Sequence, residues 1–235
     1  MANIIAVLKR SEIKYILNES QCQYIKKSLE GHMLLDQFGL CSIASLYYDT
    51  PNKRLIRASI EKPKFKEKIR LRSYGLATDD SNIFLELKRK AEGIVYKRRV
   101  TTTMSKVEKF FNKETDDIAE GQIAKEIVYF RNYYENLVPS CLIIYDREAY
   151  YEPDGDLRLT IDYNLRYRVQ DLNLKTSMEG TSLLPKGYAI LEIKVQDAIP
   201  LWLTKILDEG KIYKGSFSKY GEAFKQEILK ARGKI

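Results

Sequence analysis

The chain has 235 residues, which fits one large domain, and 40 Lys and Arg against 32 Asp and Glu give a formal net charge of +8. A hydrophobic content of 44% excludes a disordered chain, and the apolar runs are too short to cross a bilayer. The 3 cysteines lack paired or metal-like spacing, which predicts buried thiols in a reducing compartment. We therefore expect a single cytoplasmic domain over residues 1–235 with an anionic partner, and a membrane-protein partner stays open.

Strands dominate the predicted elements. Charged and apolar side chains alternate in several segments, and a period of two places each set on one face of a strand. The predicted strands cover 8–17, 42–48, 64–74, 84–90, 93–101, 141–150, 157–162 and 191–195. The segments 84–90 and 93–101 read as a hairpin whose turn glycine is Gly93.

Helical patterns fill the gaps between these strands. A helix over 19–29 follows a cap at Asn18 or Ser20, and another begins at Ser105 with a capping box to Glu108. Further helices are predicted over 123–137, from Pro200 onward and over 218–231. The predicted class is α+β, with a large antiparallel sheet and helices packed outside.

The charged strand faces are mostly cationic. Five cations of the strand 64–74 share one face, with neighbours roughly 7 Å apart by the rise per residue. An ordinary antiparallel sheet also has a charged, wet face, so that interpretation stays open for any single strand. The recurrence on five strands, and the repulsion between close cations, favour a bound polyanion.

A chain of phosphates matches these faces. Lys supplies point charges, and Arg supplies forked donors that fit phosphate oxygens. The single carboxylates among the cations fit Mg²⁺ or Mn²⁺, which bridge phosphate oxygens. The residues predicted to point into one shared cavity are Arg10, Glu12, Lys14, Lys66, Lys68, Arg70, Arg72, Glu86, Lys88, Arg158, Glu192 and Lys194.

Eight sequence blocks carry a family resemblance. They are RSEIKYIL, YYDTP, FKEKIRLRSYG, FLELKRKAEGIVYKRRV, IIYDREAYYE, DLRLTID, ILEIKV and SFSKYGEAF, in this order from about residue 8 to residue 224. The set resembles the catalytic domain of the vacuolar transporter chaperone family, the polyphosphate polymerases within the triphosphate tunnel metalloenzyme superfamily. The resemblance implies a closed antiparallel β-tunnel of about eight strands that binds ATP with a metal.

The resemblance also implies roles for individual residues. Phosphate contacts fall to Lys14, Arg70, Arg72, Lys88, Lys97, Arg147 and Arg158. Tyr145 contacts the nucleotide, Glu192 holds the metal, and Ser218 with Lys219 closes the phosphate site. The catalytic candidates among these are Arg70, Arg72, Lys88 and Arg158, and Glu12 and Glu86 join Glu192 as metal candidates.

The sequence departs from the family pattern at two positions. Eukaryotic members have a lysine where this chain has Ser216, so one phosphate contact is lost. Tunnel enzymes begin with Glu-x-Glu-x-Lys, whereas this chain has Arg10 in place of the first Glu, which favours phosphate binding and a polymerase over a hydrolase. The eukaryotic members also carry membrane segments and a regulatory domain, so the sequence resembles the stand-alone bacterial form.

The expected function is transfer of the γ-phosphate of ATP onto inorganic polyphosphate, with Mn²⁺ or Mg²⁺ as cofactor. Two alternatives stay open: a tunnel hydrolase that cleaves triphosphate or a nucleotide, and a non-catalytic module that binds a polyanion. Nucleic acid is not expected, because stacking aromatics do not interleave with the cations. The sequence lacks a GxxxxGK[ST] motif, which excludes a P-loop, and His32 is the single histidine.

Overall fold

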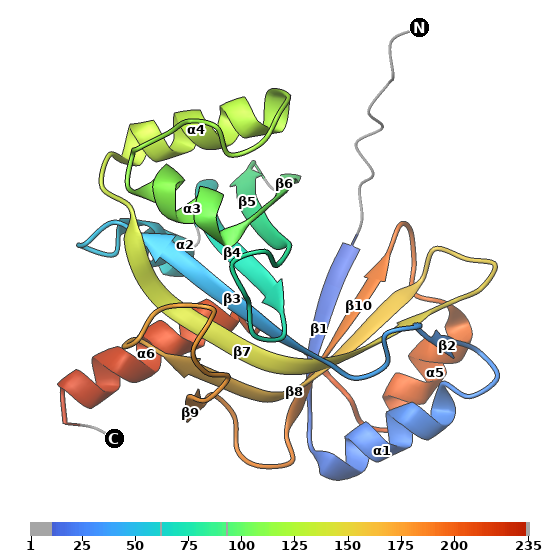
Figure 1. Cartoon of the computed structure of the whole chain (residues 1–235). Coiled ribbons are helices and arrows are strands. Elements are labelled where there is room, and N and C mark those ends of the chain that lie inside the picture. Colours follow the sequence, from blue (N-terminus) through green and yellow to red (C-terminus); the bar gives the residue numbers. More distant parts are fainter. Residues whose placement is uncertain (1–10, 62, 93, 234–235) are drawn as a thin grey trace, which may run out of the picture. The chain divides into compact units, whose positions relative to one another are not determined.

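The computed structural model describes residues 11–61, 63–92 and 94–233. These contain six α-helices and eleven strands (Figure 1). The chain divides into two compact units. The first comprises Met1–Cys41, Asp146–Asn164 and Leu184–Phe217, and the second Ser42–Tyr145, Leu165–Leu183 and Ser218–Ile235. Strands β7 (Val138–Tyr151) and β8 (Arg158–Arg168) each run through both units.

The first unit places two helices on one face of its strands. Its strands follow the order β11-β1-β10-β8-β7, with β2 paired to β7. Its own elements are β1 (Ser11–Leu17), α1 (Glu19–Ser28), β2 (Leu34–Leu35), β10 (Ala189–Val195), α5 (Leu201–Glu209) and β11 (Lys214–Gly215). Leu17, Ile25 and Leu203 share one hydrophobic cluster with buried leucines and isoleucines of β8 and β10, so α1 and α5 cover the apolar face of these strands.

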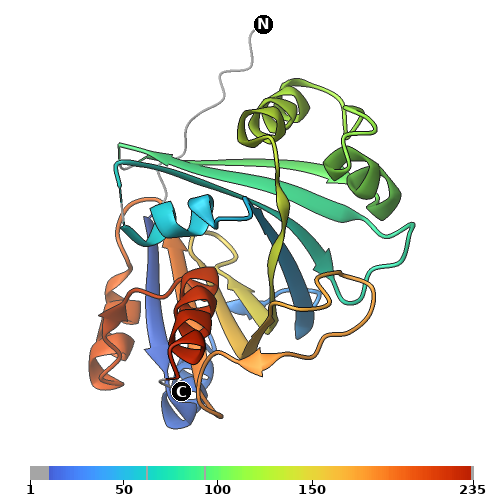
Figure 2. The same cartoon turned by 90° about the vertical axis from the view of Figure 1, so that its left-hand side faces the viewer.

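The second unit continues the antiparallel order as β7-β3-β4-β5-β6, with β9 paired to β8. Its elements are β3 (Cys41–Asp49), α2 (Arg54–Glu61), β4 (Phe65–Tyr74), β5 (Ile83–Ala91), β6 (Ile94–Thr102), α3 (Met104–Phe111), α4 (Gln122–Tyr134), β9 (Thr181–Ser182) and α6 (Lys219–Ala231). Figure 2 shows α3 and α4 on one side of the β4 and β5 ribbons.

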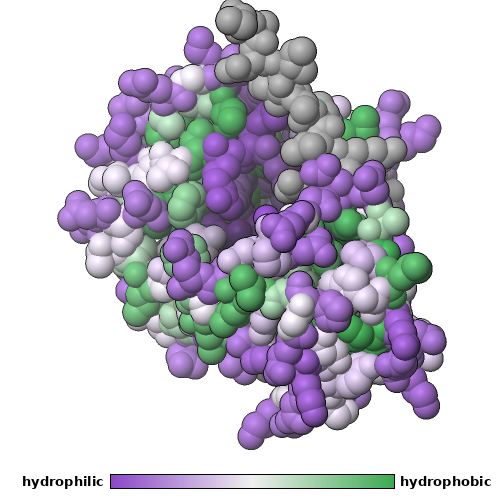
Figure 3. Space-filling view, turned by 90° about the vertical axis from the view of Figure 1, so that its right-hand side faces the viewer, coloured by the Kyte–Doolittle hydropathy of each residue, from purple (hydrophilic) through white to green (hydrophobic). Residues whose placement is uncertain are grey.

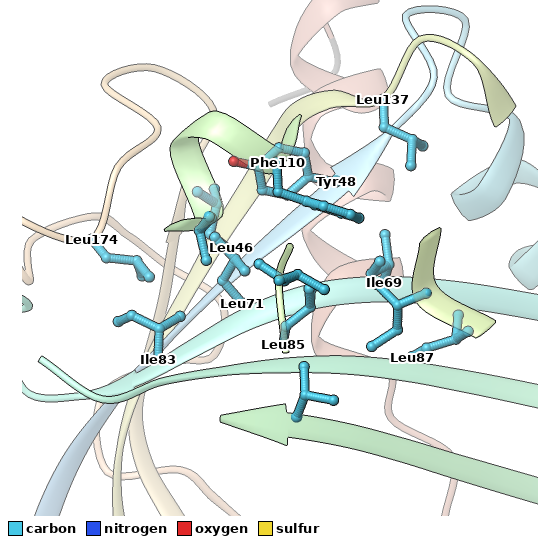
Figure 4. Close-up of a cluster of buried hydrophobic side chains, with 14 of the residues drawn as sticks. Leu46, Tyr48, Ile69, Leu71, Ile83, Leu85, Leu87, Phe110, Leu137 and Leu174 are labelled. Atoms are coloured by element: carbon cyan, nitrogen blue, oxygen red, sulfur yellow. The ribbon is translucent and has the colours of Figure 1, made fainter. Parts of the chain in front are cut away.

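The hydrophobic core of the second unit fixes the orientation of its strands. Ile69 and Leu71 of β4 and Leu85 of β5 are 0% exposed and meet Phe110 of α3 in one cluster (Figure 4). Burying one such side chain stabilises the fold by about 1.5–3 kcal/mol. Because side chains alternate along a strand, the intervening residues must point to the other face of the sheet.

The predicted α+β class with an antiparallel sheet is confirmed. The closed ring is not formed among the described residues: the pairing path has two ends, β11 and β6. β11 contains two residues and presents few backbone groups to a further strand. Alternation in a sequence reveals the faces of a strand but not its lateral partners, so the ends of the path were not predictable.

Most predicted elements are present, with three corrections. The capping box at Ser105 is wrong, because α3 begins at Met104 with Thr103 as N-cap and without a side-chain capping bond. The helix predicted over 123–137 ends at Tyr134, where Glu135 adopts a positive φ of 54°. Helix α2 was not predicted. The cap at Asn18 is confirmed by a capping box with Gln21, and Gly93 lies outside the described residues.

Hydrophilic residues cover much of the face drawn in Figure 3, with hydrophobic residues between them. Phe38 and Leu201 are examples of large apolar side chains that stay exposed. None of the helices in the described ranges combines the length and hydrophobicity needed to cross a bilayer.

Candidate functional site

One face of the second unit gathers cations from three adjacent strands. The opposite face carries the apolar core, so alternation directs the even-numbered charged residues of β4 and β5 away from α3 and α4. Residues directly opposite on neighbouring strands share a face, which adds side chains of β6. We call this surface the cationic sheet face; it consists of Lys66, Lys68, Arg70, Arg72, Glu86, Lys88, Lys97 and Arg99.

Three lysines form a row across this face. Lys68 of β4 lies opposite Lys88 of β5, and Lys88 lies opposite Lys97 of β6. Directly opposed side chains have Cβ atoms about 5 Å apart, and like charges at this distance destabilise a sheet. The register therefore places three positive charges close together, and a bound anion would reduce the repulsion between them.

The next row along the strands centres on Glu86. Arg70 of β4 and Arg99 of β6 lie opposite it on either side. Arg70 Nε donates to Glu86 Oε2 at 2.7 Å, Arg99 Nε donates to Oε1 at 2.8 Å, and Arg72 Nη2 lies 3.7 Å from Oε2. Burial raises the pKa of Glu86, but the charges of Arg70, Arg72 and Arg99 outweigh it and lower the pKa to about 2.

A second network links the cationic sheet face to the C-terminal helix. Arg70 Nη1 donates to the Tyr47 hydroxyl at 2.8 Å, and the Tyr47 ring stacks on Tyr220 of α6 at 4.5 Å. The Tyr220 hydroxyl donates to Asp49 Oδ2 at 3.0 Å. Asp49 is 0% exposed and accepts the backbone N–H groups of Leu55 and Ile56, so it also caps the start of α2. These contacts of Tyr47, Asp49 and Tyr220 thus fix the orientation of the Arg70 side chain and attach α6 to β3.

The start of α6 carries two predicted residues. Ser218 is the N-cap, and its hydroxyl accepts the N–H of Gly221 at 3.3 Å. Lys219 Nζ lies 4.7 Å from the centre of the Tyr145 ring, a cation–π distance. Tyr145 is 2% exposed. Lys219 and Tyr145 are therefore close together, while the Ser218 hydroxyl accepts a hydrogen bond from its own helix.

In the first unit, the carboxylates of Glu12 and Glu192 both lie close to the ammonium group of Lys14. Lys14 Nζ lies 3.4 Å from Glu12 Oε1 and 3.6 Å from Glu192 Oε2, and it donates to the Phe217 carbonyl at 3.4 Å. Lys194 Nζ lies 2.7 Å from the other Glu192 oxygen. Glu192 is 7% exposed. Glu12, Lys14, Glu192 and Lys194 are thus brought together on β1 and β10, as alternation predicts.

The remaining predicted residues have other surroundings. Arg147 donates two hydrogen bonds to the buried Asp162, at 2.5 and 2.8 Å, and the two residues form a bidentate ion pair. Arg158 is exposed; its guanidinium lies 5.6 Å from the Tyr151 ring centre and its Nη1 donates to carbonyls of the turn before it. Lys66 Nζ donates to the Ser59 carbonyl at 3.2 Å. Arg10 lies outside the described residues.

The surroundings of Glu192 fit a hard divalent cation. Glu12 and Glu192 supply carboxylate oxygens around one positive charge, and Mg²⁺ is usually held by one or two carboxylates with water and phosphate. Thr160 lies opposite Glu192, and its buried hydroxyl has no hydrogen-bond partner among the described residues. Clusters of three or more His, Cys, Asp or Glu side chains do not occur in the described part of the chain. A metal held here would take further ligands from a phosphate.

The family model of the VTC domain matches residues 9–228. The chain belongs to the VTC domain family. The match confirms the family expected from the ordered motifs. None of the curated proteins compared with this VTC domain matches it significantly.

Three solved structures are similar to this VTC domain at low identity, and the first of them shares its fold. A candidate adenylyl cyclase from Hippeastrum, described as having a dominant triphosphatase activity, is 17% identical with a TM-score of 0.58 over 95% of this chain and 96% of that chain. A protein from Pyrococcus horikoshii OT3 is 14% identical with a TM-score of 0.49, over 93% and 99% of the two chains. A candidate adenylate cyclase from Bacillus halodurans is 12% identical with a TM-score of 0.47, over 97% and 92%.

Five contributors to these sites were not predicted: Tyr47, Asp49, Arg99, Thr160 and Tyr220. Tyr47 lies on the strand predicted over 42–48, which carries no charged side chain to mark the functional face. Register supplies the missing signal, because Tyr47 pairs with Arg70 and Thr160 pairs with Glu192. Thr160 does share the parity of Arg158, which places it on the charged side of β8.

We predict that Glu86→Gln lowers the free energy of unfolding at pH 7 by about 3 kcal/mol, because three arginines lose their shared counter-charge. The folded pKa of about 2 lies below the ordinary value of 4.5, so the stabilisation is present above pH 4.5 and is lost as the pH falls toward 2. Urea unfolding followed by circular dichroism at several pH values measures it. Glu120→Gln, an exposed carboxylate of the same unit, is the control. A difference between wild type and Glu86→Gln that does not shrink below pH 4.5 contradicts the assignment.

Proposed function

We propose that this VTC domain transfers the γ-phosphate of ATP onto inorganic polyphosphate in a metal-dependent reaction. The observation that carries the proposal is the row of Lys68, Lys88 and Lys97 beside the arginines of the Glu86 row. A phosphate chain has about one negative charge per phosphate, and it neutralises closely spaced cations along its length. The matched range, residues 9–228, is proposed to act as one catalytic domain.

The transfer itself needs alignment and charge neutralisation rather than a protein nucleophile. A terminal oxygen of the polyphosphate chain attacks the γ-phosphorus of ATP, and the bond from that phosphorus to the β–γ bridging oxygen breaks. ADP leaves with the bonding electrons, and the polyphosphate is one phosphate longer. In this proposal Arg70, Arg72, Lys88 and Arg158 hold the reacting phosphates. Lys14, Lys66, Lys68, Lys97, Arg147, Lys194, Ser218 and Lys219 bind the rest of the substrate.

We propose Glu192, with Glu12, as the protein ligands of Mn²⁺ or Mg²⁺. When bound, the metal draws negative charge from the phosphate oxygens. Glu86 suits this role less well than Glu192, because three arginines contact its carboxylate, whereas two lysines contact that of Glu192.

A second candidate function is hydrolysis of a triphosphate. The similarity to the fold of the Hippeastrum protein, with its dominant triphosphatase activity, favours this candidate. The two reactions use the same bound triphosphate and differ in the nucleophile, which is water in hydrolysis and a phosphate oxygen in transfer. A protein that binds polyphosphate without turnover is the remaining alternative.

The products formed from ATP and Mn²⁺ separate the three functions. We predict long, acid-labile phosphate polymers and stoichiometric ADP, detected by gel electrophoresis and by phosphate release after acid treatment. Free orthophosphate without polymer, or faster turnover of tripolyphosphate than of ATP, identifies the hydrolase. Binding of polyphosphate without ADP formation identifies the binding module.

The lysine row gives a prediction on binding alone. We predict that Lys88→Met raises the Kd for tripolyphosphate about tenfold, because one charged hydrogen bond contributes roughly 1.5–3 kcal/mol. The measurement is titration calorimetry at two salt concentrations, and the salt dependence becomes shallower as a cation is lost. Lys125→Met, on the exposed side of α4, is the matched control. Equal affinity for both variants, with unchanged melting temperatures, removes Lys88 from the site.

Glu192 separates metal chemistry from anion binding. We predict that Glu192→Gln retains the wild-type melting curve within a few degrees and still binds polyphosphate, but loses Mn²⁺-dependent ATP turnover, because an amide is a poorer ligand for a hard dication. ATP turnover as a function of Mn²⁺ concentration is the measurement. Asp154→Asn, an exposed carboxylate of the same unit, is the control. Unchanged turnover removes Glu192 from the mechanism, and an unfolded variant identifies it as a structural ion-pair partner.

A further inference from the structure

The cationic sheet face ends in aromatic residues. Along β4, the residues on this face are Lys68, Arg70, Arg72 and then Tyr74. Phe84 of β5 lies opposite Arg72, so the row after the Glu86 row contains an aromatic ring in place of a carboxylate. The face therefore changes from cationic to aromatic in one direction along the strands.

These aromatic residues form a fixed arrangement. The rings of Tyr74 and Phe84 meet edge to face, with centroids 5.8 Å apart at an interplanar angle of 90°. The guanidinium of Arg99, which also binds Glu86, lies 4.8 Å from the Phe84 ring centre. Phe84 is thus held between a ring and a cation, and it supports Tyr74 from the side.

Tyr74 itself remains accessible. Tyr74 is 53% exposed, although Ser73 before it is buried. Holding an aromatic ring in water against a rigid neighbour leaves apolar surface that a planar ligand can cover. Tyr145, to which the family resemblance assigned the nucleotide, is 2% exposed and has Lys219 beside its ring. Tyr74 therefore offers the larger accessible ring surface.

Arg72 supplies a second and independent indication of a ligand. It is 7% exposed, and its Nε has no hydrogen-bond partner among the described residues. Leaving such a donor unsatisfied costs about 1–3 kcal/mol, more for a charged group. A phosphate oxygen beside Arg72 satisfies this donor. Arg72 lies between Arg70 and Tyr74 on the same face, so the donor sits where the cationic and aromatic parts meet.

We propose that Tyr74, supported by Phe84, is a stacking platform for the base of a nucleoside triphosphate whose phosphates lie along Arg72 and Arg70. The inference rests on the proposed function and deepens it, because it separates the nucleotide from the phosphate polymer. The residues from Arg70 to Tyr74 span roughly 14 Å by the rise per residue, which is the scale of one extended nucleotide. A polyphosphate chain has no base and uses the cationic rows alone. Stacking tolerates any base, so ATP and GTP bind equally.

The test compares ligands with and without a base. Dissociation constants for ATP, GTP and tripolyphosphate are measured by titration calorimetry with the full chain. Tyr74→Leu is expected to raise the Kd for ATP and GTP about tenfold, because stacking of a base on an aromatic ring contributes roughly 1–3 kcal/mol. The Kd for tripolyphosphate is expected to change less than twofold. Tyr74→Phe keeps the ring and retains wild-type affinity, and Tyr129→Leu, an exposed tyrosine of α4, is the matched control.

Each other outcome has one meaning. Equal weakening of ATP and tripolyphosphate by Tyr74→Leu, or no weakening of either, overturns the stacking platform and leaves the proposed phosphate transfer intact. Loss of affinity in Tyr74→Phe as well shows that the hydroxyl, rather than the ring, contacts the ligand, and it also overturns the proposal. If the wild-type protein binds none of the three ligands, the proposed function fails together with the platform.

Discussion

Crowding of positive charge on one face of a sheet is the constraint on which the second unit depends. The register places Lys68, Lys88 and Lys97 side by side, and the backbone hydrogen bonds of β4, β5 and β6 keep them there. The apolar side chains on the opposite face fix this register, because a slip of one residue exchanges core and charged faces. The core therefore supplies the free energy that holds these cations close together on one face.

The protein balances this charge unevenly. Glu86 neutralises part of the arginine row, and the arginines in turn lower the pKa of Glu86 well below its usual value. The adjacent row consists of Lys68, Lys88 and Lys97. The orientation of Arg70 is set by its hydrogen bonds to Glu86 and Tyr47. Preorganised donors of this kind lose little entropy when a phosphate binds.

Alternation along the sequence predicted which face of a strand each side chain occupies, but it did not predict which residues of different elements contact one another. The parity of Arg70, Arg72 and Glu86 gave the correct face for each, because side-chain direction has a period of two along a strand. The link between Tyr47 and Tyr220 was not predictable, since it joins residues 173 positions apart through stacked rings. The Ser105 capping box failed because the helix begins one residue earlier, at Met104, which is buried in the core. Tertiary packing overrides a weak local signal in such cases.

The hydrogen bond between Tyr220 and Asp49 has a consequence for synthesis of the chain on the ribosome. Asp49 becomes fully buried, yet one of its donors belongs to α6, which is made 171 residues later. Until Tyr220 leaves the exit tunnel, Asp49 has the N–H groups at the start of α2, but the Tyr47 ring has no cover from α6. The nascent second unit can collapse around its core strands early, whereas its charged face takes its final form only after α6 has been translated.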